Sequence, residues 1–289
     1  MRSTESFSKY NNLENQSTIE LLKIINNEDK KVPYEVEKSL NNIKILIDKI
    51  LNKMNKGGRL FYIGSGTPGR LGIVDASECP PTYGVDNNVI IGLIAGGDDA
   101  IRNSIENAED DFNQAWKDLK NHNISSKDSV IGITASGRTP YVIGGLKYSS
   151  KNNILTGLIT SNTKSKASQY AEVVIETILG PEVITGSTRM KSGTAQKLIL
   201  NMISTCLMIK LGKVKGNKMV DMMLSNSKLV DRGIRFVSDE LKVSYKESKN
   251  MITKYNSVRK AIKEYKKKRL KKSLYNVAGA GLEPATFGL

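Results

Sequence analysis

RLFYIGSGTPGRLGIVDASECPP, residues Arg59–Pro81, is the part of the sequence that is most informative about the fold. An apolar run, Leu60–Ile63, leads directly into a glycine-rich loop, Gly64–Arg70, and a short helical segment then ends at Glu78 beside two prolines. Glycines allow backbone N–H groups to approach an oxyanion, and the dipole of a following helix favours negative charge at the loop. We therefore expect the chain to bind a phosphorylated small molecule.

Strand-like and helix-like segments alternate on the C-terminal side of this stretch. Residues 16–56, on its N-terminal side, carry two helical patterns that end at Gly57-Gly58. Short strands alternating with helices predict an α/β fold with a mostly parallel sheet, whose ligands bind at the carboxyl ends of the strands. Beyond Leu60–Ile63, strands are expected at 89–95, 129–134, 155–160 and 173–176, and helices at 69–78, 100–119, 140–149 and 195–211.

Length and composition indicate an ordinary globular protein. With 289 residues, 39% of them hydrophobic and 25% charged, the chain can form one large α/β domain with helical additions. Its N-terminus lacks the apolar core of a secretion signal, and no apolar run is long enough to span a membrane. The two cysteines, Cys79 and Cys206, form neither a disulfide framework nor a zinc-binding spacing. We expect a cytoplasmic protein without a metal site.

The net charge of +15 is concentrated near the C-terminus. Residues 242–272 hold 13 of the 44 lysines and arginines but 2 of the 29 acidic residues, so the rest of the chain is only mildly basic. This distribution favours a solvated helical face over a nucleic-acid site. Aromatic residues make up only 6% of the chain, which also argues against a base-stacking surface.

The pattern Gly64-x-Gly66-x-x-Gly69 also fits the dinucleotide-binding fingerprint. That fingerprint requires an acidic residue about 20 positions further on, whereas the first acidic residue after the second predicted strand is Asp98, about 30 positions on. A second hydroxyl-rich loop, moreover, follows another predicted strand. One phosphate group bound by both loops would explain why the chain has two such loops, whereas a dinucleotide would explain only the first. The candidate ligands are Ser65, Thr67, Ser136, Gly137, Arg138 and Thr139. Two plain turns, or a nucleotide-dependent dehydrogenase, remain as alternatives.

Two glutamates are candidate proton-transfer groups. Glu78 is predicted to end a helix, where its negative charge opposes the helix dipole, and this favours the protonated form that a general acid needs. Glu109 is expected at the edge of the apolar stripe of the predicted helix 100–119 and therefore to be partly buried. The alternatives are that Glu78 is an ordinary exposed glutamate and that Glu109 only lies at the edge of the apolar stripe, without a role in proton transfer.

A third polar loop, Gly186–Thr194, precedes a predicted helix that is apolar nearly all round. It contains Arg189 and Lys191, and arginine can hold a carboxylate with two hydrogen bonds while lysine acts as a point charge. This indicates a site for an anionic group distinct from the phosphate. Simple helix capping by Ser192 or Thr194 is the alternative interpretation.

Four segments together resemble one enzyme family. The region from about Thr4 to Arg232 is similar to N-acetylmuramic acid 6-phosphate etherases, which belong to the phosphosugar isomerase-like (SIS) domain superfamily. The resemblance implies a flavodoxin-like parallel sheet between helices, a homodimer with its site near the subunit interface, and no cofactor. The segments are DASECPPTYGV (75–85), GLIAGGDDAIRNSIENAEDD (92–111), ASGRTPYVIGGL (135–146) and GPEVITGSTRMKSGTAQKLILNMIST (180–205).

The resemblance also implies a reaction. Such enzymes cleave the D-lactyl ether of N-acetylmuramic acid 6-phosphate by elimination followed by hydration. The acid of the family matches Glu78 and its second carboxylate matches Glu109, which we expect to be the base, while Arg189 and Lys191 are expected to bind the lactyl carboxylate. Another phosphosugar isomerase and a non-catalytic phosphosugar-binding regulator are alternatives, and the presence of both glutamates favours catalysis.

This chain departs from the family pattern at two places. Pro68 replaces a serine, which removes a hydroxyl and an N–H group from the first loop. The C-terminal helical extension is expected to be shortened, and residues 277–289 follow no pattern of the family and are expected to be disordered. The expected organisation is an N-terminal helical segment (1–56), a SIS domain (57–232), a helical extension (233–276) and the tail (277–289).

Overall fold

A computed structural model describes residues 3–278 of the chain. They divide into two compact units. Of the described residues, unit 1 is formed by 3–79 and 85–211, and unit 2 by 80–84 and 212–278. The extension expected from residue 233 lies within unit 2. None of the helices in residues 3–278 combines the length and the apolar character needed to cross a membrane.

Unit 1 contains a five-stranded, fully parallel sheet with the order β2-β1-β3-β4-β5. This is the flavodoxin-like order of doubly wound folds, in which the direction of winding reverses between β1 and β3. The α/β fold class is confirmed, and each expected strand agrees with the structure to within one residue at either end. The strands are β1 (Leu60–Gly64), β2 (Ile90–Ile94), β3 (Ser129–Ile133), β4 (Leu155–Thr160) and β5 (Val173–Glu176).

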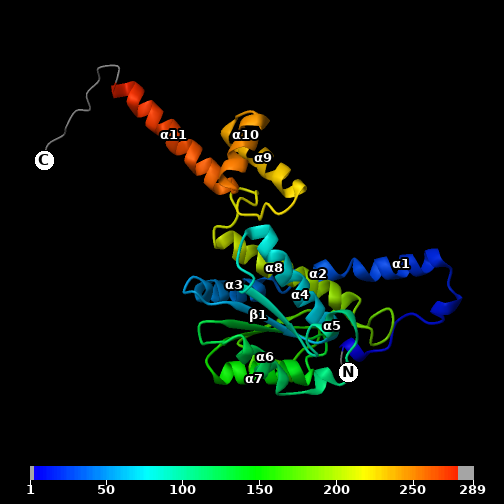
Figure 1. The fold of residues 1–289 in the computed structure, drawn as a ribbon. Coiled ribbons are helices and arrows are strands. Elements are labelled where there is room, and N and C mark those ends of the chain that lie inside the picture. Colours follow the sequence, from blue (N-terminus) through cyan, green and yellow to red (C-terminus); the bar gives the residue numbers. More distant parts are fainter. Residues whose placement is uncertain (1–2, 279–289) are drawn as a thin grey trace. The chain divides into compact units, whose positions relative to one another are not determined.

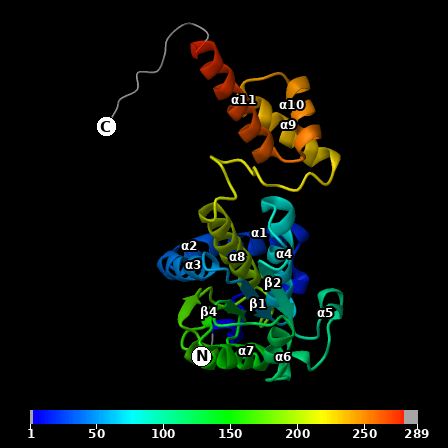
Figure 2. The same ribbon diagram turned by 60° about the vertical axis from the view of Figure 1, so that its left-hand side comes forward.

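Helices cover both faces of this sheet (Figures 1 and 2). On one face lie α6 (Gln114–Asn121) and α7 (Pro140–Lys151), and on the other lie α3 (Leu40–Met54), α8 (Lys191–Lys210) and the unit 1 part of α4 (Gly66–Tyr83). Because both faces are covered, every residue of β1, β3 and β4 is buried, as is usual for strands of parallel sheets. The remaining elements of unit 1 are α1 (Thr18–Asp29), α2 (Val32–Glu37), α5 (Asp99–Arg102) and the 3-10 helices Ser3–Glu5, Leu13–Asn15, Ala108–Asp110 and Ala167–Tyr170.

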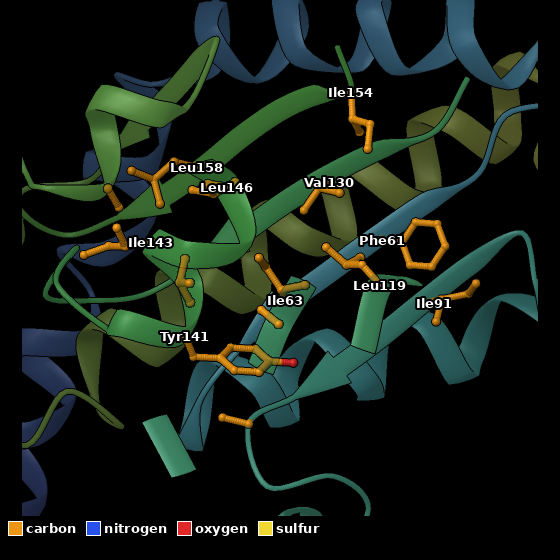
Figure 3. Packing of buried hydrophobic residues seen from close by; sticks show 14 residues of the cluster. Phe61, Ile63, Ile91, Leu119, Val130, Tyr141, Ile143, Leu146, Ile154 and Leu158 are labelled. Atoms are coloured by element: carbon orange, nitrogen blue, oxygen red, sulfur yellow. The ribbon is translucent and has the colours of Figure 1, made fainter. Parts of the chain in front are cut away.

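Alternate side chains of β1 connect the sheet to both helical layers. Phe61 and Ile63 point into a buried apolar cluster that includes Leu119 of α6 and Tyr141 of α7 (Figure 3). The hydroxyl group of Tyr62, on the opposite face, lies 3.1 Å from a carboxylate oxygen of α4. This alternation follows from the two-residue period of a strand, and it fixes the carboxyl end of β1 between the two layers.

The expected end of a helix at Glu78 is wrong. Helix α4 continues through Pro80 and Pro81 to Tyr83, and the Gly84 N–H group closes its last turn on the Pro80 carbonyl at 2.9 Å. The fixed φ of proline is compatible with a helix, although each proline removes one backbone hydrogen bond. Glu78 therefore lies inside a helix and not at its end.

The expected helix 100–119 is also wrong, because the chain forms α5, a 3-10 turn and α6 in its place. The Arg70 guanidinium group donates hydrogen bonds to the carbonyls of Ile101 and Asn103, at 2.9 and 3.1 Å, and thereby holds the chain where α5 ends. Asn107 then adopts a left-handed conformation with φ 59°. The apolar residues of this segment therefore do not form one continuous stripe.

Unit 2 is a helical unit with its own apolar core. Helices α9 (Ser227–Leu241), α10 (Tyr245–Tyr255) and α11 (Val258–Ala278) pack around a buried cluster that includes Ile234, Val237, Ile252 and Ala261. The side chain of Asn226 caps α9, and that of Ser244 caps α10. Of the expected disordered tail, Val277 and Ala278 end α11, and 279–289 lie outside the described residues.

Candidate active site

The first hydroxyl-rich loop connects β1 to α4. A Cβ atom on Gly69 would lie 2.8 Å from the carbonyl oxygen of Gly64, so only glycine permits this tight turn. Ser65 and Thr67 are half-buried at the start of α4. Pro68 lies in the first turn of that helix, where a backbone N–H group has no partner within the helix. The loop therefore keeps its helical start although it has lost the serine.

The second loop follows β3 and is held by Thr134, a buried residue that was not predicted as part of the site. The Thr134 hydroxyl oxygen accepts a hydrogen bond from the Gly137 N–H group at 3.2 Å and lies 2.9 Å from the Thr139 hydroxyl. Ser136 accepts a bond from the backbone N–H group of Arg138, whose side chain is exposed. A threonine at the end of a strand, directly before a glycine loop, is the sequence signal that identifies such a turn.

These two loops lie side by side. Strands β1 and β3 are paired, with Gly64 opposite Ile133, so both loops leave the sheet at its carboxyl edge where the winding reverses. Ligands of doubly wound proteins bind at this position. The structure therefore brings together Ser65 and Thr67 with the second loop, from Ser136 to Thr139.

The third loop precedes α8 and touches the first. The Gly193 N–H group donates to the Thr188 carbonyl at 3.1 Å, and a Cβ atom on Gly193 would lie 3.3 Å from the methyl group of Thr67. The side chain of Arg189, in the turn beside Thr188, is exposed. Arg189 thus lies on a loop whose end is in contact with the start of α4.

Lys191 does not fit its predicted role as a substrate ligand. Its side chain is 2% exposed, and its ammonium group donates to a carboxylate oxygen of Glu28 at 2.7 Å and to the Leu179 carbonyl at 2.9 Å. The start of α8 is capped by the buried carboxylate of Glu182, which accepts the N–H groups of Lys191 and Ser192 at 2.9 and 3.0 Å. Lys191 is therefore a structural residue and not a substrate ligand, and neither Ser192 nor Thr194 caps the helix.

Glu28 is held in its ionised form by its partners. Burial opposes ionisation of this carboxyl group, but hydrogen bonds from Lys191, Lys31 and Tyr10 outweigh burial and lower the pKa of Glu28 to about 2. The Tyr10 hydroxyl donates to the same carboxylate at 2.8 Å. No local sequence pattern indicates this pair, because its two members are 163 residues apart.

Glu109 is exposed, so its predicted partial burial is wrong. It lies on the 3-10 turn Ala108–Asp110, which packs against α7. Helix α7 begins at Pro140, directly after the second loop. The structure therefore places Glu109 beside a helix that starts at the candidate phosphate site.

Glu78 is exposed as well, but it is far from the loops of its own chain. It follows Gly66, the first residue of α4, by 12 positions, which corresponds to about 18 Å along a helix that rises about 1.5 Å per residue. The structure therefore does not bring Glu78 together with Ser65 and Thr67 within one chain.

Asp75, one helical turn before Glu78, is a buried carboxylate that was not predicted from the sequence. It accepts hydrogen bonds from Asn201 at 2.8 Å, Ser204 at 3.0 Å and Tyr62 at 3.1 Å, and so joins α4 to α8 and β1. Burial raises the pKa of Asp75, against the effect of these hydrogen bonds. Burial also raises the pKa of the neighbouring Cys79 thiol, to about 12.

Comparison with known families and structures agrees with this fold. The SIS domain family matches residues 113–205, and the family described as the glucokinase regulatory protein N-terminal SIS domain matches residues 42–150. A putative phosphosugar isomerase involved in capsule formation from Bacteroides fragilis superposes with a TM-score of 0.54 at 18% identity, over 70% of this chain and 95% of that one. A phosphoheptose isomerase from Francisella tularensis gives a TM-score of 0.53 at 11% identity, over 66% and 98%. At these identities the likeness shows the fold alone.

Sequence relatives match at much higher identity. An N-acetylmuramic acid 6-phosphate etherase from Christiangramia forsetii is 56% identical over 266 residues, which cover 92% of this chain and 97% of the relative. One from Porphyromonas gingivalis is 53% identical over 93% and 98%, and one from Caldanaerobacter subterraneus is 58% identical over 76% and 72%. At this identity and coverage, the chain belongs to the N-acetylmuramic acid 6-phosphate etherase family.

Proposed function

We propose that this chain cleaves the D-lactyl ether of N-acetylmuramic acid 6-phosphate and releases N-acetylglucosamine 6-phosphate and D-lactate. The observation that carries the proposal is family membership over nearly the whole chain, at more than half identity to relatives that bear this enzyme name. The two hydroxyl-rich loops at the carboxyl edge of the sheet support it, because they suit the phosphate group that such a substrate carries.

The substrate phosphate is proposed to bind between the two loops. Hydroxyl groups of Ser65 and Thr67 on one side, and of Ser136 and Thr139 on the other, supply hydrogen-bond donors, and the start of α4 adds a favourable dipole. Gly137 allows the backbone of the second loop to approach the phosphate, and the exposed guanidinium group of Arg138 adds positive charge there. Arg189 is the proposed partner of the lactyl carboxylate.

Glu109 and Glu78 are proposed to move the protons. Glu109 removes the proton at C2, which is acidified by the C1 aldehyde of the opened sugar. The C3–O bond then breaks and its electron pair leaves with the lactyl oxygen, which Glu78 protonates. Water adds to the resulting C2–C3 double bond, so that its oxygen becomes the new C3 hydroxyl group. In this second step the Glu78 carboxylate takes a proton from the water as its oxygen bonds to C3, and Glu109 returns its proton to C2. Both groups thereby regain their starting protonation states, which balances the sequence.

We also propose that the chain acts as a homodimer whose site combines both subunits. Glu78 lies about 18 Å along α4 from the first loop of its own chain, which is further than one sugar phosphate extends. Glu78 shares an exposed face of α4 with Val74, which is 57% exposed, and Ile19 and Leu22 of α1 are each 57% exposed. These apolar side chains suit a subunit interface. Glu78 of the partner subunit would then complete the site.

Mixing two variants tests this arrangement. Heterodimers of Glu78→Gln with Ser136→Ala contain one site in which both groups are intact if the site is shared. Lactate release at low substrate concentration should then exceed that of either variant alone after the subunits are exchanged, and light scattering should give the mass of a dimer. No recovery in mixed dimers would place both groups in one chain.

The cytoplasm is the proposed location. Cys79 and Cys206 are both free, which suits a reducing compartment. A carbohydrate lyase there would act on amino sugars derived from the cell wall. Fractionation of cells that produce the tagged chain would test this placement, and recovery outside the cytoplasmic fraction would contradict it.

The decisive test of the reaction is to incubate the purified chain with N-acetylmuramic acid 6-phosphate and to measure D-lactate. In water enriched in oxygen-18, the label should enter the sugar product and not the lactate, because water adds after the C3–O bond has broken. Aldose–ketose interconversion without lactate would instead indicate an isomerase. Binding of the phosphosugar without turnover would indicate a regulator.

A further inference from the structure

The N-terminal segment, residues 4–31, contacts the second loop through one buried residue. The Asn162 amide group donates to the Thr4 hydroxyl at 2.8 Å and to the Ala135 carbonyl at 3.0 Å, while the Thr4 N–H group returns a bond of 3.4 Å to the Asn162 side chain. Thr4 is 2% exposed and Asn162 is 5% exposed. Because Ala135 begins the second loop, Thr4 is connected to this loop through a single side chain.

The same segment also contacts the stretch that leads into the third loop. The Ser8 hydroxyl group donates to the Val183 carbonyl at 2.7 Å, and the Ser8 N–H group donates to the Thr185 hydroxyl at 2.9 Å. At the C-terminal end of the segment, Glu28 forms the buried ion pair with Lys191, the first residue of α8. The third loop is therefore held to the N-terminal segment on both sides of Arg189.

Apolar burial alone does not fix how the segment is docked here. Glu28 is the one residue of α1 that is buried, and the 3-10 helix Leu13–Asn15 contains no buried residue. The apolar residues Leu21, Ile24 and Ile25 of α1 are half-buried, so the hydrophobic effect contributes to the docking of this helix without any fully buried apolar side chain. The buried contacts of the segment are polar, and they converge on two of the three loops of the candidate site.

We propose that the N-terminal segment is a positioning element of the substrate site. Thr4 acts through Asn162 on the second loop, and Glu28 acts through Lys191 on the third, so both are positioning residues that do not touch the substrate. Shifts of about 1 Å in groups that hold a substrate can reduce the rate about 100-fold. The inference rests on the proposed function only for the identity of the substrate.

The experiment compares two variants at position 4. Thr4→Val keeps the shape of the side chain but removes the hydroxyl group, and Thr4→Ser keeps the hydroxyl. Loss of one neutral hydrogen bond corresponds to roughly a 2- to 12-fold change in an equilibrium constant. We expect Thr4→Val to raise KM, and to weaken the affinity for N-acetylglucosamine 6-phosphate measured by calorimetry, by a factor in this range. Thr4→Ser should behave as wild type. An unchanged KM and affinity in Thr4→Val, whatever its melting temperature, would overturn the proposal.

A second readout does not depend on catalysis. Hydrogen exchange of backbone amides should become faster in residues 135–139 of Thr4→Val and in residues 183–190 of Glu28→Gln. Lys49→Gln breaks a surface ion pair with Glu172 and is the matched control, with no change expected in either stretch. If wild type releases no lactate, the proposed function fails, and exchange rates still decide this inference. If Glu28→Gln does not fold, Thr4→Val alone tests the proposal. Unchanged amide exchange in residues 135–139 of Thr4→Val would then refute the proposal.

Discussion

Asp75 and Glu78 are carboxylates one turn apart on the same helix, but their surroundings give them different roles. Asp75 is 6% exposed and accepts three hydrogen bonds from β1 and α8, whereas Glu78 is exposed. A buried carboxylate with all its partners inside the protein constrains packing and has no access to substrate. An exposed one can meet a substrate without disturbing the fold, which is consistent with the proton-donor role that we propose for Glu78.

Glu78→Gln should fold and bind the phosphosugar but lose lactate release. The amide cannot donate the proton that the leaving oxygen needs, and general acid catalysis contributes about 10²- to 10⁴-fold. The C2 proton should still exchange with heavy water, because its removal precedes the lost step. Glu106→Gln, a change at another exposed glutamate, is the control. Lactate production near the wild-type rate in Glu78→Gln would remove Glu78 from the mechanism.

The buried carboxyl of Asp75 should make stability depend on pH. Because burial raises its pKa in the folded state, the stability contributed by this group is present below the ordinary value of 3.8 and is lost as pH rises through the raised pKa. The side chain in Asp75→Asn cannot ionise. The melting temperature of this variant minus that of wild type should therefore be larger at about pH 7 than at about pH 3.5. The exposed Asp48→Asn is the control. An equal difference at both pH values would contradict this assignment.

The second loop owes its shape to backbone geometry at one position. Gly137 has φ +66°, and a Cβ atom there would lie 2.2 Å from the Cβ atom of Ser165. Its N–H group is bonded to Thr134 at the end of β3. The left-handed backbone and the close approach to Ser165 together exclude every residue except glycine at this position.

Gly137→Ala should therefore distort this loop. Positive φ costs a side chain roughly 1–2 kcal/mol, and the overlap with Ser165 adds to this because a backbone-linked Cβ atom must move. Gly97→Ala is a matched control, since Gly97 has φ +68° and nothing within 4 Å of the added Cβ atom. We expect a larger loss of melting temperature, and of phosphosugar affinity by calorimetry, for Gly137→Ala than for Gly97→Ala. Equal losses would show that contact with Ser165 is unimportant.

Among the described residues, 3–278, separate apolar clusters are built from different parts of the chain. In unit 1 the sheet lies between helical layers, and one of its clusters joins β1 to α6 and α7 (Figure 3). In unit 2 a separate cluster joins α9, α10 and α11. Ile234 and Val237 of α9 are covered by residues of the later helices, which include Ile252 and Ala261. Unit 2 therefore depends on its last two helices for its core.

Two deletions distinguish the extension from the tail. Removal of residues 243–289 should expose Ile234, Val237 and Leu241, which are buried in the intact chain, and should lower the melting temperature or cause aggregation. Removal of 279–289, which lie outside the described residues, should leave activity and melting temperature unchanged, because this stretch contains little that could be buried in a core. A marked loss of activity from the short deletion would assign the tail a role in the fold.

The sequence by itself determined the parts of the protein that local pattern controls. Apolar runs located all five strands, and glycine with serine or threonine located the loops at the carboxyl ends of β1 and β3. These signals are readable because strand burial and tight turns depend on residues that are close in sequence. Pattern also singled out Glu78 and Glu109, but through a helix end and a partial burial that the structure contradicts. The roles of acid and base in the proposed reaction came from the resemblance to a family.

Only the tertiary structure decided which polar groups are free. Lys191 looks like a ligand in its loop, yet Glu28, 163 residues away, neutralises it in the interior. Arg70 holds the chain at the end of α5 by binding carbonyls more than 30 residues further on, and so no continuous helix holds Glu109 at the edge of an apolar stripe. Burial and ion pairing depend on distances through space, which a local period of 3.6 or 2 residues does not encode.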